Sequence, residues 1–177
     1  MAALGYCTTG SRQYPLAVLD LREANAQDSR FLAEMLAVAA DWRPDAPQRT
    51  AEAILRLPEF AHYIAEWPRP GDRGVIAEVG HPVGAAWFRL LPVADKGYGF
   101  VADDVPEITI GVRPGHRGSG IGTALLSHLV QQARDANLRA VSLSVEDGNP
   151  AIRMYARAGF VEVDHDEGAA TMLLLLQ

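Results

Sequence analysis

The stretch GVRPGHRGSGIGTALL, residues 111–126, limits what this chain can fold into more than any other. It places glycines at positions 115, 118, 120 and 122, and it passes directly into a segment whose apolar residues recur every three or four positions as far as Asn137. This pattern predicts a glycine-rich loop that opens an amphipathic helix. The first turn of a helix has unpaired N–H groups and a positive dipole end, so we expect the loop to hold a phosphate group.

Two common phosphate-binding motifs fit this loop only in part. The dinucleotide fingerprint G-x-G-x-x-G/A fits Gly118 and Gly120 but meets Thr123 at its third position. The P-loop fits at its two glycines but has Ile121 where its lysine must stand, so nothing would reach the terminal phosphates. The pattern that remains is R-x-x-G-x-G, beginning at Arg117. A nucleotide-binding oxidoreductase is therefore disfavoured.

Hydrophobic periodicity and turn residues predict strands and helices along the rest of the chain. Strands are expected at residues 14–21, 74–79, 82–92, 107–112, 140–145, from 160 onward and at 171–176. Helices are expected at residues 29–40, 50–57 and 59–67, from the glycine-rich loop to 137, and from Asn149-Pro150 to Gly159. Asparagine followed by proline is a favourable helix start, since the asparagine caps and the proline fits the first turn.

Composition limits the broad class. The 177 residues are most simply a loose tail at residues 1–13 and a single domain at residues 14–177. With 16 basic and 22 acidic side chains the net charge is −6, which argues against nucleic acid as a partner. No apolar run is long enough for a membrane span. The single cysteine, Cys7, cannot form an internal disulfide, and we expect a cytoplasmic protein.

The order of features after residue 107 resembles the GNAT superfamily, the acetyl-CoA-dependent N-acetyltransferases. The residues that carry the resemblance are EITIGVRPGHRGSGIGTALL and SLSVEDGNPAIRMYARAGF, which together cover about residues 107–160. The resemblance implies an α/β (α+β) fold in which a mixed, mostly antiparallel sheet of about seven strands is flanked by helices. It also implies acetyl-CoA as cosubstrate, with no metal.

The resemblance assigns residues to the coenzyme. Its pyrophosphate would lie against the main-chain N–H groups of the loop, which agrees with the phosphate site expected from the residues alone. These loop residues are Gly118, Ser119, Gly120, Gly122 and Thr123. Arg117 is either a further phosphate contact or a solvated charge. Main-chain groups of Ile110 and Val112 would pair with the pantetheine arm, and Asn149 would lie beside that arm as well as capping its helix.

Two residues are candidates for proton transfer. Tyr155 matches the tyrosine that the family uses as general acid toward the leaving thiolate, and its alternative role is packing within its helix. Glu107, at the start of the strand before the loop, is the candidate base, and its alternative is a solvated carboxylate at a strand edge. Glu78 and His81 are held in reserve as bases.

The activity implied by the resemblance is transfer of an acetyl group to a primary amine by direct attack within a ternary complex. The alternative is a non-catalytic acyl-CoA-binding regulatory domain on the same fold. The acceptor is expected to be a small-molecule or peptide amine, bound between residues 42–67 and 97–106. The sequence of these two segments does not identify which amine it is. A homodimer is compatible with the sequence.

Overall fold

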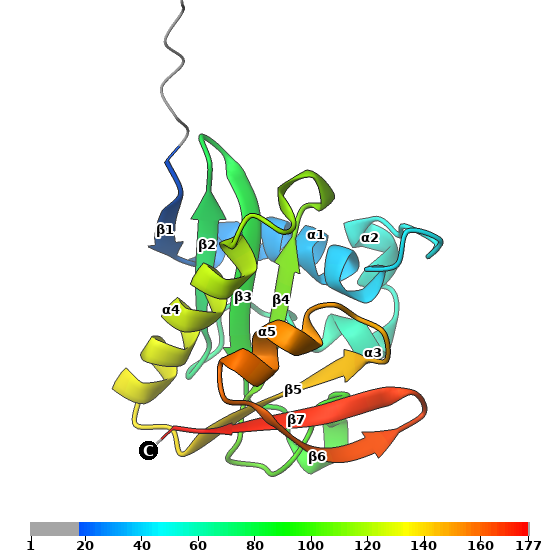
Figure 1. Cartoon of the computed structure of the whole chain (residues 1–177), viewed down its shortest axis with the longest axis vertical. Helices are drawn as coiled ribbons and strands as arrows, with labels where there is room; N and C mark the ends of the chain where they lie inside the picture. The colour runs from blue at the N-terminus through cyan, green and yellow to red at the C-terminus, as the bar shows by residue number, and fades with distance from the viewer. Residues whose placement is uncertain (1–17, 177) are drawn as a thin grey trace, which may run out of the picture.

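The computed structural model describes residues 18–176, so the expected tail and residues 14–17 lie outside the described part. Its centre is a seven-stranded sheet with the order β1-β2-β3-β4-β5-β7-β6. All neighbouring strands are antiparallel except β4 and β5, which are parallel. The mixed, mostly antiparallel sheet expected from the sequence is confirmed (Figure 1). The strands are β1 Asp20–Glu23, β2 Arg73–Glu78, β3 Pro82–Arg89, β4 Glu107–Val112, β5 Ala140–Glu146, β6 Val161–Asp166 and β7 Ala169–Leu175.

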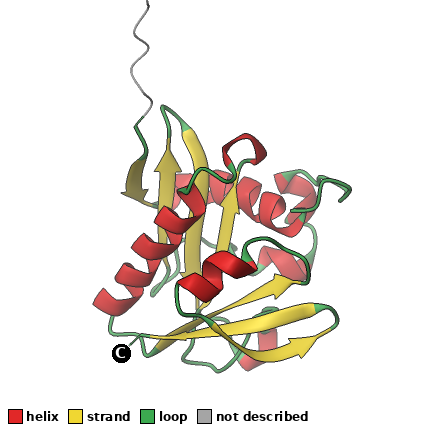
Figure 2. Ribbon diagram, in the orientation of Figure 1, coloured by secondary structure: helices red, strands yellow, loops and turns green. Residues whose placement is uncertain are grey.

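Helices cover both faces of the sheet (Figure 2). The helices are α1 Ser29–Ala40, α2 Ala51–Ile54, α3 Pro58–Ala61, α4 Ile121–Asp135 and α5 Ile152–Arg157. Short 3-10 turns lie at Ala26–Asp28, Val93–Asp95 and Pro114–His116. Two apolar cores result, one beneath α4 and α5 and the other beneath α1 to α3. Successive side chains of β3 point to opposite faces of the sheet, so this strand contributes to both cores. Ala86 and Phe88 belong to the first core, and Ala85 and Trp87 belong to the second. Within residues 18–176, none of the helices combines the length and the apolar character that crossing a bilayer requires.

The strands β4 and β5 separate almost as soon as they meet. Their ladder consists of a single pair, Glu107 opposite Ser142, next to a hydrogen bond from the Ser142 N–H to the Pro106 carbonyl. Beyond that point β4 remains paired with β3, whereas β5 pairs with β7 along its whole length. The sheet therefore opens into a V whose apex is Glu107.

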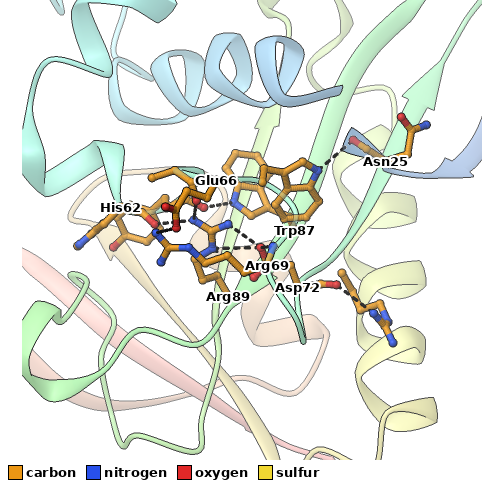
Figure 3. Close-up of polar contacts among 11 residues, drawn as sticks. Asn25, His62, Glu66, Arg69, Asp72, Trp87 and Arg89 are labelled. Carbon is orange, nitrogen blue, oxygen red and sulfur yellow. Dashed lines mark hydrogen bonds and ion pairs between the residues drawn. The ribbon is translucent and has the colours of Figure 1, made fainter. Parts of the chain in front are cut away.

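The segment that precedes β2 is less helical than its sequence pattern predicts. A helix was expected over residues 59–67, but α3 ends at Ala61 and turns follow. The reason is visible in the contacts from β3 (Figure 3). The guanidinium of Arg89 donates to the carbonyls of His62 and Ala65, and the indole of Trp87 donates to the carbonyl of Tyr63. These carbonyls are held by side chains of the sheet, so the segment is fixed as irregular turns.

The first strand also differs from its prediction. Within the described residues, β1 begins at Asp20 and ends at Glu23, later than the expected strand at residues 14–21. Its position is set by pairing with β2 and by Arg22, which binds both Asp28 and Glu78. Alternation in the sequence cannot reveal these long-range ion pairs. The other predicted elements agree with the structure to within a few residues.

Candidate active site

A cavity of about 900 Å³ opens at the V between β4 and β5. Its walls come from the C-terminal end of α1, from α3, from residues 96–100, from β4 and β5, and from the hairpin of β6 and β7. Glu107, Tyr155, Ile110 and Asn149 all line it. The strand separation thus gathers candidate residues that lie up to 48 positions apart in the sequence.

Glu107 is a buried carboxylate at the apex of the V, and only 4% of its surface is exposed. Its Oε1 accepts a hydrogen bond of 2.6 Å from the Tyr63 hydroxyl and one of 2.9 Å from the Gly99 N–H. Its Oε2 is buried and has no hydrogen-bond partner among residues 18–176. Burial raises the pKa of Glu107 to about 7, against the opposing effect of its two hydrogen bonds. The group can therefore exchange a proton near neutral pH, through the free oxygen.

Two glycines allow the chain to pass close to this carboxylate. A side chain at Gly97 would overlap Glu107 and the Tyr63 hydroxyl, and one at Gly99 would overlap the backbone of β5 at Leu143 and Ser144. The N–H groups of Tyr98 and Gly99 are thereby brought to Tyr63 and Glu107 respectively. The loop before β4 therefore closes one side of the Glu107 carboxylate.

Tyr63 is held in place from the neighbouring strand. Trp87 donates to its carbonyl at 3.0 Å, and Arg89 donates to the carbonyls on either side, at His62 and Ala65 (Figure 3). Arg89 is 1% exposed and also pairs with Asp72. Because Arg89 and Trp87 fix the backbone around Tyr63, its hydroxyl is directed at Glu107. Burial and the Glu107 carboxylate raise the pKa of Tyr63 far above its usual value, so this hydroxyl stays protonated as a donor.

Tyr155 approaches the same cavity from the opposite face of the sheet. It lies on α5 within the core beneath α4 and α5, whereas Tyr63 lies in the core beneath α1 to α3. Its ring packs against Phe160, and no group among residues 18–176 hydrogen-bonds to its hydroxyl. Burial raises the pKa of Tyr155 to about 12, so the phenol is protonated at neutral pH.

The edge of β4 that faces the V carries main-chain groups without a strand partner. Pro106 accepts from Ser142 of β5 on this side, and Arg113 donates to Val83 of β3 on the other. Main-chain groups of successive strand residues point alternately to the two sides, so those of Ile110 and Val112 face the V. The carbonyl of Val112 accepts a hydrogen bond from Arg117, which leaves the N–H of Val112 and both groups of Ile110 available.

The glycine-rich loop lies beyond the cavity, where β4 leads into α4. Gly118 and Gly120 have positive φ angles of 75° and 87°, and a side chain at either would meet no protein atom within 4 Å. The N–H groups of residues 118–123 have no acceptor among residues 18–176. Gly122 instead faces Met154 of α5, so its lack of a side chain lets α4 and α5 approach each other. The loop has the open, N–H-lined form that a phosphate group requires.

Arg117 and Asn149 both have structural partners. The guanidinium of Arg117 donates to the carbonyls of Val112, Trp42 and Val38, and it thereby ties the loop to the end of α1. The Asn149 side chain accepts from the Ala151 N–H just before α5, but the helix begins at Ile152 with Ala151 at its N-cap, so the expected cap by Asn149 is wrong. Each residue therefore positions a segment of the site, whatever further contact it makes.

The sequence model of the Acetyltransferase (GNAT) family matches residues 33–160. The chain belongs to this family. Its match includes the V of β4 and β5, the glycine-rich loop and Tyr155.

Curated relatives of this GNAT chain carry the names of different acetyltransferases. The mycothiol acetyltransferase of Saccharomonospora viridis is 31% identical over 144 residues, which is 79% of this chain and 44% of the relative. The streptothricin acetyltransferase of Streptomyces lavendulae is 46% identical over 91 residues, or 51% of this chain and 39% of the relative. The chain thus spans less than half the length of these relatives.

Solved structures share the GNAT fold over nearly the whole chain. The protein yncA of Salmonella typhimurium, solved with its cofactor acetyl-CoA, superposes with a TM-score of 0.66 at 25% identity and covers 90% of this chain and 94% of that one. The GNAT domain of the Streptomyces lividans protein PAT superposes with a TM-score of 0.64 at 20% identity and covers 88% and 89% of the two chains.

Among the candidate bases of this GNAT chain, only Glu107 lines the cavity. Glu78 accepts from Arg22 at the β1 side of the sheet, and His81 is exposed in the turn between β2 and β3, with its ring near His116. Sequence reasoning did not find Tyr63. The pair of glycines around Tyr98 was an available signal, since two closely spaced glycines outside a tight turn often mark close backbone approach.

Proposed function

We propose that this protein transfers an acetyl group from acetyl-CoA to a primary amine by direct attack within a ternary complex. The observation that carries the proposal is that Glu107 and Tyr155 reach one cavity from opposite faces of the sheet, at the point where β4 and β5 separate. A base is needed on the side of the amine and an acid on the side of the leaving sulfur, so this arrangement suits the two proton transfers.

The chain offers a continuous set of contacts for the coenzyme. The free N–H groups of residues 118–123 would hold the pyrophosphate at the start of α4, and the main-chain groups of Ile110 and Val112 would pair with the pantetheine arm. Arg117 and Asn149 would support this path through the segments that they position. Acetyl-CoA supplies the activated acetyl thioester and a thiolate leaving group.

The protonation states of the two side chains suit their proposed roles. Glu107, with a pKa near 7, is substantially ionised at neutral pH and would accept the proton of an ammonium group at Oε2, directly or through water. Tyr155, with a pKa near 12, would donate its phenolic proton to sulfur. The N–H of Val112 lies at the open edge of β4, where it would donate to the thioester oxygen as negative charge develops.

The proposal is tested by measuring thiol release from acetyl-CoA in a panel of monoamines, diamines, amino acids, amino sugars and peptides. We expect saturable, amine-dependent release, with N-acetylated product identified by mass spectrometry. Binding of acetyl-CoA in calorimetry without amine-dependent release would instead favour the alternative of a non-catalytic acyl-CoA-binding domain. The same panel with propionyl-CoA would define the acyl donor.

A further inference from the structure

The mouth of the cavity carries an excess of negative charge. Its acidic lining includes Glu59 of α3 together with Asp166 and Glu167 of the β6–β7 hairpin, all of them exposed. The basic lining residues are Arg43, Arg49 and Lys96. Two of these charges are already balanced, because Arg43 pairs with Glu146 at 3.1 Å and Arg49 pairs with Asp41 at 2.5 Å. Lys96 is the remaining positive charge at the mouth, and it is outnumbered.

The acidic groups share the cavity with an exposed aromatic ring. Tyr98 lines the cavity with 58% of its surface exposed, and its ring lies 5.8 Å from that of Phe60. Partial burial and the charges of Glu59 and Glu167 raise the pKa of Tyr98, and Arg49 opposes this shift. Glu59 of α3 and Glu167 of the β6–β7 hairpin line the same cavity as Tyr98, from two different walls. A cavity lined by an aromatic ring and by several carboxylates is a favourable environment for an organic cation.

A second, independent feature of the same cavity is a buried acceptor that lacks a hydrogen-bond donor. Glu107 Oε2 is buried and has no donor among residues 18–176, and such an oxygen is costly to leave unpaired. Asp and Glu of the mouth cannot supply a donor while ionised, since a carboxylate only accepts. The cavity thus presents acceptors at two places, the apex of the V and the mouth.

We propose that the acceptor is a dication: one amine lies at Glu107 and reacts, while a second ammonium group is held at the mouth by Glu59, Glu167 and the ring of Tyr98. This inference rests on the proposed function and narrows its substrate to amines that carry a second positive charge. The second group keeps its proton throughout, so it contributes to binding and orientation and takes no part in proton transfer. The balance of negative over positive charge at the mouth is the reason that a neutral or acidic tail would bind less well.

The test compares linear diamines of three to eight carbons with n-alkylamines of the same length, using the thiol-release assay. We expect the best diamine to have a KM at least about tenfold below that of its matched monoamine, with the advantage reduced at high salt because exposed charges are screened. The chain length at which the preference is greatest would measure the separation of the two sites. Equal KM values for diamines and monoamines at every length would overturn the inference and leave the proposed function intact. Absence of turnover with every amine would overturn both.

Substitutions at the mouth of the cavity test where the second ammonium group binds. In the double variant Glu59→Gln and Glu167→Gln we expect KM for the best diamine to rise about 3- to 20-fold, with a smaller rise for the monoamine. Glu162→Gln is the matched control, since Glu162 is an exposed carboxylate of β6 that does not line the cavity. All three positions are exposed, so the variants should fold, which a thermal melt would check. If KM rose equally for diamine and monoamine, or rose equally in the control variant, the second ammonium site could not be assigned to the mouth of the cavity.

Discussion

The hydroxyl of Tyr63 donates to Oε1 of Glu107 at 2.6 Å, across 44 positions of sequence. Together with the N–H of Gly99 it occupies one oxygen of the carboxylate, and the other oxygen, Oε2, has no hydrogen-bond partner among residues 18–176. The hydrogen bond also stabilises the ionised form of Glu107, in opposition to burial. Tyr63 is therefore proposed as a positioning residue for the base, acting on its geometry and on its pKa.

Tyr63→Phe should shift the pH dependence of acetyl transfer. Loss of the donor removes stabilisation of the Glu107 carboxylate, so its pKa rises and the alkaline-rising limb of kcat/KM moves upward by about 1–2 pH units. The rate should fall most below pH 7 and recover at high pH. Glu107→Gln is the reference, because the same limb should disappear in it. A uniform loss at all pH values would mean that Tyr63 acts through packing alone.

Glu107→Gln should also change how stability depends on pH. The folded-state pKa of Glu107 is about 7, above the ordinary value of 4.5, so the folded protein binds more protons than the unfolded chain between these values. The contribution of this group to the free energy of unfolding is therefore greatest at low pH and falls as pH rises through that window. Glutamine cannot ionise, so the variant should gain stability relative to the wild type from about pH 4.5 to 7. Urea unfolding at several pH values would show this, and parallel curves would contradict it.

Tyr155→Phe should lower kcat while leaving acetyl-CoA affinity nearly unchanged. General acid catalysis is worth about 10²–10⁴-fold, and a thiolate leaves readily enough that we expect the lower end. Stability should change little, because the ring still packs against Phe160 and the hydroxyl has no partner among residues 18–176. Single-turnover kinetics and calorimetry would separate the two effects. An unchanged single-turnover rate in the variant would mean that Tyr155 serves only in packing.

Gly120→Val should abolish tight binding of acetyl-CoA. Valine is strained at a φ of 87° and places a branched side chain in the space in front of the loop. Acetyl-pantetheine, which lacks the pyrophosphate, should lose much less rate than acetyl-CoA. Gly115→Ala is the matched control, since a side chain there also meets no protein atom within 4 Å and Gly115 is not among the glycines of positive φ. Wild-type affinity in Gly120→Val would remove the loop from the coenzyme site.

Arg89→Met should destabilise the fold and disturb the base. It leaves the buried carboxylate of Asp72 unpaired, a change that typically costs about 3–5 kcal/mol of unfolding free energy. Replacing both partners, with Arg89→Met and Asp72→Leu, should recover part of this loss. The recovery should be incomplete, because the carbonyls of His62 and Ala65 still lack their donor. Guanidinium unfolding of the three proteins would measure it.

The glycine-rich loop and the helix after it were predictable from the sequence alone. The loop at residues 118–123 depends on glycines at alternate positions and on the helix that follows. A glycine-rich turn before a helix is a local feature, so spacing along the chain is enough to predict it. The bounds of β4 and the approximate bounds of α4 were predictable for the same reason, because periodicity is a local signal.

The surroundings of Glu107 and the walls of the cavity, by contrast, became clear only in the folded chain. In the sequence, Glu107 has the pattern of an ordinary carboxylate at a strand edge. In the fold, Tyr63, Gly97 and Gly99 surround it. The predicted helix over residues 59–67 ends early because Arg89 and Trp87, more than twenty positions away, hold its carbonyls. Burial and hydrogen bonding by distant residues set both the pKa of the carboxylate and the path of that segment, and neither is encoded in local spacing.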